Sequence, residues 1–280
     1  MPERPDLEYV VPILRGALLG RRITGVRVRK PVVLRATVAP EALIGAAFGA
    51  VERVGAFVCF ALDGPWHLAV HPMLAGRFRV TEATAKDPGD LALALALDER
   101  DELRYRDDVQ MGKVYLHPRG GEASVPGLLP VGIDVLDPAF TVDELRRRAK
   151  GRREQVRVWL MDKAAFDGFG NAYADEVLWA AGLHPKLPVT KLDAPSFIRL
   201  HAAMVSVTRD SIDTIAARRP ATDEKIRDFL AVRNRGGEPC RRCGATVRAA
   251  GVHGHDTFFC PTCQPDVAGK GFVDWRRAKG

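Results

Sequence analysis

The chain opens with Met1-Pro2-Glu3-Arg4-Pro5-Asp6-Leu7-Glu8, a stretch that contains a candidate nucleophile. A small second residue permits removal of Met1, which would leave Pro2 as a secondary amine at the N-terminus. Because an α-amino group titrates at about pH 8, part of it is unprotonated and nucleophilic in the cell. Such an amine can attack a sugar C1′ to form a covalent iminium, with Glu3 as proton donor and acceptor. The alternative is an ordinary protein start that leads into a helix.

A helix is predicted directly after this opening. Pro5 suits a first helical turn, and the apolar residues that follow recur at helical spacing: Leu7, Val11, Leu14 and Leu18. Pro12 falls inside this pattern, so we expect a kink or a late start. Gly20 is a candidate C-cap.

Length and composition indicate a basic protein of more than one domain. The 280 residues are 46% hydrophobic, enough for two domains and a small third module. The net charge of +7 favours a polyanionic partner, nucleic acid first. The sequence contains no apolar run of about 18 residues and begins with an acidic, proline-bearing stretch, so we expect neither a signal peptide nor a membrane span.

The first part of the chain, up to about Leu116, has the pattern of a β-sandwich or flattened barrel. Short apolar or alternating runs lie between turn residues, at 23–29, 57–62, 67–71, 76–80, 91–97 and 113–116. Residues 117–140 are rich in proline and glycine and look like an interdomain connection. Helical patterns follow at 142–150, 153–165, 172–181, 194–217 and 222–230.

A glycine-rich turn between two of these helices is a candidate phosphate site. Gly168-Phe169-Gly170 permits a tight turn, and Asn171 would occupy a helix N-cap position. Unsatisfied backbone N–H groups and the helix dipole favour an anion there. Arg157, on the preceding helix, could close on the same phosphate. The alternative is an ordinary αα-hairpin without a ligand.

Four of the five cysteines form two CxxC pairs, Cys240-x-x-Cys243 and Cys260-x-x-Cys263, separated by the sixteen residues 244–259. In a chain without a secretion signal this spacing indicates a closed tetrahedral zinc site rather than disulfides. We expect one structural Zn²⁺ that supplies much of the folding energy of a small hairpin module. The fifth cysteine, Cys59, lies in an apolar run and is expected in the core.

These three motifs together resemble the formamidopyrimidine-DNA glycosylase and endonuclease VIII family. The shared elements are the opening Met1-Pro2-Glu3-Arg4-Pro5-Asp6, the segment Gly168-Phe169-Gly170-Asn171-Ala172-Tyr173-Ala174-Asp175-Glu176, and the four-cysteine finger after Gly237-Glu238-Pro239. They stand in the family's order and span nearly the whole chain.

The resemblance implies a multidomain α+β architecture. It implies an N-terminal catalytic β-sandwich (1–125), a helix–two-turns–helix DNA-binding domain (135–232) and a zinc finger (233–268). It also implies a monomer in the bacterial cytoplasm, associated with the nucleoid. Its partner would be double-stranded DNA with a damaged base or an abasic site, and the damaged base would be flipped out of the duplex.

By the same resemblance, Pro2 would attack C1′ and Glu3 would protonate the sugar. The iminium would then drive strand cleavage by β-elimination. Asn171 matches the family's phosphate-binding asparagine, and Arg157 stands where the family usually has a phosphate-binding lysine.

Several positions depart from the family pattern. Ala56 or Phe57 occupies the place of a DNA-contacting lysine, and Arg53 is the nearest cation. His255, five residues before the third cysteine, replaces the finger arginine and would be mostly neutral at pH 7.

The residues expected to fill the gap left by a flipped base also differ from the family's. The loop Asp107-Asp108-Val109-Gln110-Met111-Gly112 lacks the family's arginine, so Met111 is a candidate wedge and Gln110 a partner for the orphan base. Leu74 falls at the second gap-filling position.

Three hypotheses remain open at the level of sequence. The first is an active, bifunctional DNA glycosylase and lyase. The second is a catalytically weak or inactive damaged-DNA-binding protein of the same fold, which the missing lysine and finger arginine suggest. The third is a zinc-ribbon protein that acts on RNA or protein partners.

Overall fold

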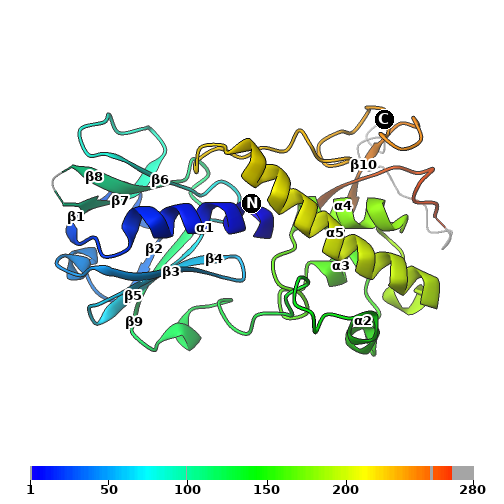
Figure 1. Cartoon of the computed structure of the whole chain (residues 1–280), viewed down its shortest axis with the longest axis horizontal. Helices are drawn as coiled ribbons and strands as arrows, with labels where there is room; N and C mark the ends of the chain where they lie inside the picture. Colours follow the sequence, from blue (N-terminus) through cyan, green and yellow to red (C-terminus); the bar gives the residue numbers. More distant parts are fainter. Residues whose placement is uncertain (1, 99, 253–254, 267–280) are drawn as a thin grey trace. The chain divides into compact units, whose positions relative to one another are not determined.

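The computed structural model in Figure 1 describes residues 2–98, 100–252 and 255–266. The chain divides into two compact units. The first runs to Val131 and includes Ile212–Lys225, and the second comprises Gly132–Ser211 and the chain from Ile226 onward. No helix within the described ranges is long and apolar enough to cross a membrane.

The first unit begins with helix α1 (Arg4–Leu18), which carries its apolar residues on one buried face. The helix starts at once, so the predicted late start is wrong. Pro12 lies inside the helix on its exposed side. Proline has no backbone N–H, so the helix lacks one hydrogen bond there. Gly20 follows the helix end with φ +77°, a conformation that costs glycine little.

Two β-sheets form the body of the first unit, which confirms the predicted sandwich (Figure 1). The four-stranded sheet has the order β1 (Ile23–Val28), β7 (Leu91–Leu97), β8 (Asp101–Arg106) and β6 (Arg77–Glu82), and all neighbours are antiparallel. The five-stranded sheet has the order β2 (Leu34–Ala36), β9 (Lys113–Pro118), β5 (Trp66–His71), β4 (Phe57–Leu62) and β3 (Phe48–Val54). Only β2 and β9 pair in parallel in this sheet. The sequence analysis missed β2, β3 and β8.

One core joins α1 to both sheets. Leu14 of α1, Phe60 of the five-stranded sheet and Leu95 of the four-stranded sheet belong to the same cluster of buried apolar side chains. Ala94 of β7 lies opposite the buried Arg104 on β8, and its small side chain leaves room for that residue. Short 3₁₀ helices connect the elements of the whole chain: η1 (Pro31–Val33), η2 (Pro40–Leu43), η3 (Glu122–Ser124) and η4 (Val189–Lys191).

The segment that follows α5 (Ala194–Arg218) belongs to the first unit up to Lys225. We predicted a helix at 222–230, and this prediction is wrong, because the segment contains turns and extended chain. Tyr9 Oη donates to the carbonyl of Pro220 at 2.7 Å, and Thr222 Oγ1 donates to that of Phe78 at 2.8 Å. Long-range bonds to α1 and β6 therefore replace the local bonds of a helix.

The second unit is helical, with α2 (Val142–Ala149), α3 (Val156–Leu160), α4 (Asn171–Ala181) and the N-terminal part of α5. Thr141 caps α2, its side chain accepting from the backbone N–H of Glu144 at 3.2 Å. The helix predicted at 153–165 is reduced to α3. Trp159, Tyr173 and Leu200 are fully buried at the centre of this unit.

The hairpin of β10 (Arg248–Val252) and β11 (His255–Phe259) completes the second unit. Strand β11 packs on α4. This contact brings the cysteine module to the helix that carries Asn171.

Candidate functional site

Pro2 and Glu3 lie at the N-terminus of α1, and both are buried, with Glu3 only 4% exposed. The backbone N–H of Glu3 donates to Asp6 Oδ2 at 2.8 Å. This bond fixes the peptide next to the predicted nucleophile. Met1 lies outside the described residues, so its predicted removal stays a prediction.

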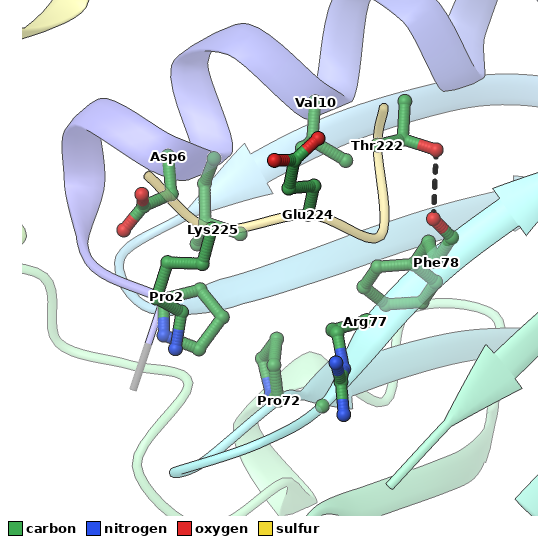
Figure 2. A pocket seen from close by; sticks show the side chains of 11 residues that line it. Pro2, Asp6, Val10, Pro72, Arg77, Phe78, Thr222, Glu224 and Lys225 are labelled. Carbon is green, nitrogen blue, oxygen red and sulfur yellow. Dashed lines mark hydrogen bonds between the residues drawn. The ribbon is translucent and has the colours of Figure 1, made fainter. Parts of the chain in front are cut away.

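Pro2 lines a pocket whose walls come from three parts of the first unit (Figure 2). The lining residues are Pro2, Asp6, Leu7 and Val10 from the start of the chain, Pro72, Gly76, Arg77 and Phe78 from β6 and the turn before it, and Thr222, Glu224 and Lys225. The volume is about 30 Å³, which holds no more than a few water molecules. A larger group can enter only if side chains at the rim move.

The pocket wall contains two cations that the sequence analysis did not single out. Arg77 Nη2 lies 3.4 Å from Asp90 Oδ2 and 3.5 Å from Asp108 Oδ1. Lys225 Nζ donates to the carbonyl of Leu74 at 3.2 Å. Neither residue belongs to a sequence motif, and both reach Pro2 only through long-range folding.

Two of the predicted gap-filling residues present apolar side chains at the surface of the first unit. Leu74 is 48% exposed and Met111 is 43% exposed. Exposed large apolar side chains on loops are costly in water and suit contact with an apolar partner such as a base stack. Gln110, beside Met111, has a positive φ of 58°.

A buried carboxylate shapes the loop that carries Gln110 and Met111. Asp107 accepts three backbone N–H bonds, from Val109 at 3.1 Å, Gln110 at 2.9 Å and Gly112 at 2.7 Å. Gly112 has no room for a side chain, because a Cβ there would lie 1.8 Å from the hydroxyl of Tyr105. Asp107 therefore holds the conformation of this loop, a role that its sequence position alone did not reveal.

The turn between β3 and β4 offers no cation at the place of the family lysine. The two residues expected at that place, Ala56 and the buried Phe57, both lack a charge. Arg53 points elsewhere, since its Nε donates to Glu8 at 2.9 Å and its Nη1 to the carbonyl of Gly55 at 2.8 Å. Arg53 therefore does not substitute for the lysine in this conformation.

In the second unit, Arg157 and Asn171, the two predicted phosphate-binding residues, lie in direct contact, and their binding of a phosphate stays a prediction. Arg157 is 0% exposed, its Nη2 donates to Asn171 Oδ1 at 3.0 Å, and its Nε donates to Asp175 Oδ1 at 2.7 Å. Its buried Nη1 has no hydrogen-bond partner among the described residues. Asn171 is the first residue of α4 and Gly170 is the N-cap, so the predicted cap position was wrong by one residue.

The bond from Arg157 occupies the amide oxygen of Asn171. Its amide NH₂ is therefore the group that can donate to an external acceptor. Asn171 is partly exposed, whereas Arg157 Nη1 is buried, so an external anion would reach the arginine only after a movement of side chains.

A second arginine, Arg233, completes this cluster. Its Nη1 donates to Asp175 Oδ2 and to the carbonyl of Asp256, both at 2.9 Å, and its guanidinium lies 5.0 Å from the centre of the Phe258 ring. The side chain is 18% exposed, so its remaining N–H groups have access to solvent. The sequence analysis missed Arg233, although the basic run before the first cysteine was a signal.

Glu176 fixes the chain that leads to the zinc module. Its carboxylate accepts from the backbone N–H groups of Ala231, Val232 and Arg233, at 2.7, 2.9 and 2.8 Å. Burial is the largest influence on the pKa of Glu176 and raises it, while the three amide donors act in the opposite direction. His255 lies in β11, paired with Val252, and its side chain is outside what the structure describes.

The four predicted zinc ligands converge. The sulfur atoms of Cys240, Cys243, Cys260 and Cys263 all lie within 4.8 Å of one another. Two of the separations are 3.9 Å (Cys240 to Cys263) and 3.5 Å (Cys243 to Cys260). A tetrahedron with Zn–S bonds of about 2.3 Å places its sulfurs about 3.8 Å apart, so the residues fit one structural Zn²⁺.

Comparison with known protein families gives one consistent result along the chain. Residues 1–114 match the formamidopyrimidine-DNA glycosylase N-terminal domain, and residues 131–219 match the formamidopyrimidine-DNA glycosylase H2TH domain. Residues 237–265 match a zinc finger found in FPG and IleRS.

Individual relatives are similar over almost their whole length. The formamidopyrimidine-DNA glycosylase of Symbiobacterium thermophilum is 35% identical over 275 residues, covering 95% of this chain and 90% of the relative. That of Acidothermus cellulolyticus is 35% identical over 280 residues, covering 95% and 98%.

Solved structures of the Lactococcus lactis Fpg have the same fold. A complex with DNA containing an abasic site has a TM-score of 0.84 at 23% identity, and a complex with DNA containing N7-benzyl-Fapy-dG has 0.84 at 25%. Each covers 95% of this chain and 100% of the other.

Proposed function

This chain belongs to the formamidopyrimidine-DNA glycosylase family, and we propose that it excises oxidised bases from duplex DNA through Pro2. Its relatives support a DNA glycosylase and lyase of base-excision repair. We also propose which residues carry out the reaction, three domains at 1–125, 135–232 and 233–268, and a role on the bacterial chromosome in the cytoplasm.

The reaction would begin with the unprotonated nitrogen of Pro2. Its lone pair forms a bond to C1′ of the flipped nucleotide, and the C1′–N bond to the base breaks with both electrons leaving on the base. Glu3 donates a proton to the sugar oxygen, which opens the ring and yields an iminium between Pro2 and C1′.

Strand cleavage follows from the same intermediate. The iminium acidifies the C2′ proton, and Glu3, now a carboxylate, can accept it. The electrons of the C2′–H bond form a C2′–C3′ double bond, and the C3′–O bond breaks, so the 3′ phosphate leaves. Water then hydrolyses the iminium and restores the amine of Pro2.

The DNA backbone would bind to the second unit through Asn171, Arg157 and Arg233. The amide of Asn171 and the unpartnered Nη1 of Arg157 supply donors at the start of α4. A phosphate there would satisfy a buried donor that otherwise has no partner, which makes its binding favourable. Leu74 and Met111 would fill the space left by the flipped base, and Gln110 would hydrogen-bond the orphan base. His255 stays a predicted phosphate contact of the finger.

The observation that carries this proposal is that Pro2 lines a pocket (Figure 2), while the next residue in the chain, Glu3, is a buried carboxyl group. A carboxyl group at the first turn of a helix, beside a proline that lines a pocket, is the arrangement that iminium chemistry needs.

Borohydride trapping tests the proposal. The processed protein is incubated with duplexes that contain an abasic site or oxidised bases, and a covalent adduct is expected. Pro2→Gly should abolish trapping on damaged bases, and Glu3→Gln should do so while leaving binding intact. Lys86→Met, which changes an exposed lysine, is the matched control. Equal adduct with Pro2→Gly would reject Pro2 as the nucleophile.

One observation favours the second candidate, a damaged-DNA-binding protein without efficient turnover. Ala56 supplies no charge, and Arg53 is bonded to Glu8 and Gly55. Tight binding to a broad panel of damaged duplexes with no excision in a single-turnover assay would support this candidate over the enzyme.

A further inference from the structure

A lysine side chain extends into the pocket of the proposed nucleophile. Lys225 lines the pocket together with Pro2, and Figure 2 shows its side chain extending toward the ring of Pro2. Its Nζ donates to the carbonyl of Leu74 at 3.2 Å. An ammonium group is therefore held at the wall that Pro2 also forms.

The position of Lys225 is built into the fold. Two residues earlier, the buried carboxylate of Asp223 accepts from Arg106 at 2.6 Å and from Arg79 at 3.3 Å. Thr222 is bonded to the backbone of β6, and the segment is bonded to Tyr9 of α1 at its start. Four contacts thus fix a stretch of six residues (220–225), so Lys225 is not a side chain on a loose loop.

The other charged groups around the pocket have defined arrangements. Asp6 accepts from the backbone N–H of Glu3, and Arg77 pairs with two aspartates. Figure 2 shows the Glu224 carboxylate pointing toward Val10 rather than toward Pro2. Of the two cations in the wall, Lys225 is the one that extends along Pro2.

We propose that Lys225 is a positioning residue that keeps the nitrogen of Pro2 unprotonated. A protonated Pro2 and the Lys225 ammonium would be like charges at one small pocket, and a neighbouring like charge disfavours the charged form of an amine. Lys225 thereby raises the fraction of Pro2 that can attack C1′. This inference rests on the proposed role of Pro2 as the nucleophile.

The pKa of the Pro2 nitrogen measures this effect without DNA. Protein labelled with ¹⁵N-proline and lacking Met1 is titrated by NMR, for the wild type and for four variants. Lys225→Met should raise the pKa of Pro2 by roughly one unit. Lys225→Arg, which keeps the charge, should leave it close to the wild-type value.

Two further variants separate charge from structure. Glu224→Gln removes a negative charge from the same segment and should shift the pKa of Pro2 by less, in the opposite direction. Lys86→Met should leave it unchanged. If the variants acted only by disturbing segment 220–225, Lys225→Met and Glu224→Gln would shift the pKa of Pro2 in the same direction. That result would overturn the proposal.

Activity provides the second readout. The rate of borohydride trapping rises with pH as Pro2 loses its proton, and Lys225→Met should move this rise to higher pH by the same amount as the NMR titration. Identical titrations of Pro2 in wild type and Lys225→Met would overturn the role of Lys225 and leave the proposed function standing. The expected NMR shift without any trapped adduct would reject the proposed function alone.

Discussion

At the scale of single residues, Asp175 organises the side of the second unit that is proposed to bind phosphate. Its two carboxylate oxygens accept from Arg157, Arg233, Thr257 Oγ1 and the backbone N–H of Phe258. A fully buried carboxylate is stable only with such partners. Asp175 lies in α4, and its partners come from α3, from the chain before the first cysteine and from β11. This one residue therefore aligns the groups proposed to bind DNA.

Arg157 and Asn171 should differ sharply in their effects on stability. Arg157→Met removes the buried partner of Asp175 and should lower the free energy of unfolding by about 3 kcal/mol. Asn171→Ala leaves Asp175 paired and should cost less than about 1 kcal/mol while weakening binding to an abasic-site duplex. Urea unfolding and fluorescence anisotropy check the two effects, and equal destabilisation by both variants would contradict this division.

Arg233 should behave as a phosphate contact. Replacing it with glutamine should reduce the slope of log K against log salt for DNA binding by about one, because one fewer phosphate is neutralised. Arg235→Gln is the matched control, since Arg235 is as well covered as Arg233 but pairs with Glu238. An unchanged slope in Arg233→Gln, with normal zinc content, would remove Arg233 from the interface.

At the scale of elements, a tryptophan of α4 contacts the cysteine cluster of the zinc module directly. Trp179 Nε1 donates to Cys240 Sγ at 3.4 Å, and the guanidinium of Arg242 lies 4.1 Å from the ring centre. Loss of the metal would release the four cysteines, and the contacts of Trp179 with Cys240 and with Arg242 would then be lost. The module and α4 are therefore expected to loosen together.

Removal of zinc with a chelator should change the fluorescence of Trp179 and abolish DNA binding. The module has a small apolar core, so most of its folding free energy comes from the metal. Trp179→Phe should eliminate the fluorescence change, whereas Trp159, buried in the helical core, should contribute none of it. A change that persists in Trp179→Phe would place the response elsewhere.

The segment 220–225 should depend on its carboxylate anchor. Asp223→Asn weakens the bonds to Arg79 and Arg106 and should lower the free energy of unfolding of the first unit by about 2 kcal/mol. It should also expose the chain near Lys225 to trypsin. Asp98→Asn, an exposed partner of Arg21, should cost less than about 1 kcal/mol and leave the cleavage pattern unchanged.

At the scale of the whole molecule, motifs with local signals were predictable from the sequence. The zinc ligands follow from cysteine spacing, the start of α4 near Asn171 from a glycine turn, and the sandwich from alternating strands. Lys225 and Asp223 were not predictable, because each reaches its site through partners far away in the sequence, whereas for Arg233 the basic run before the first cysteine was the one local signal. The false helix at 222–230 has the same cause, since tertiary bonds override local periodicity there.

The identity of the residue that becomes covalently attached to DNA tests the central claim most directly. Wild-type protein without Met1 is trapped with borohydride on an oxidised-base duplex, digested with nuclease and protease, and analysed by tandem mass spectrometry. The account predicts a reduced sugar remnant on the nitrogen of Pro2. A remnant on a lysine, Lys225 included, or a purified protein that retains Met1 and still forms the adduct, would contradict it.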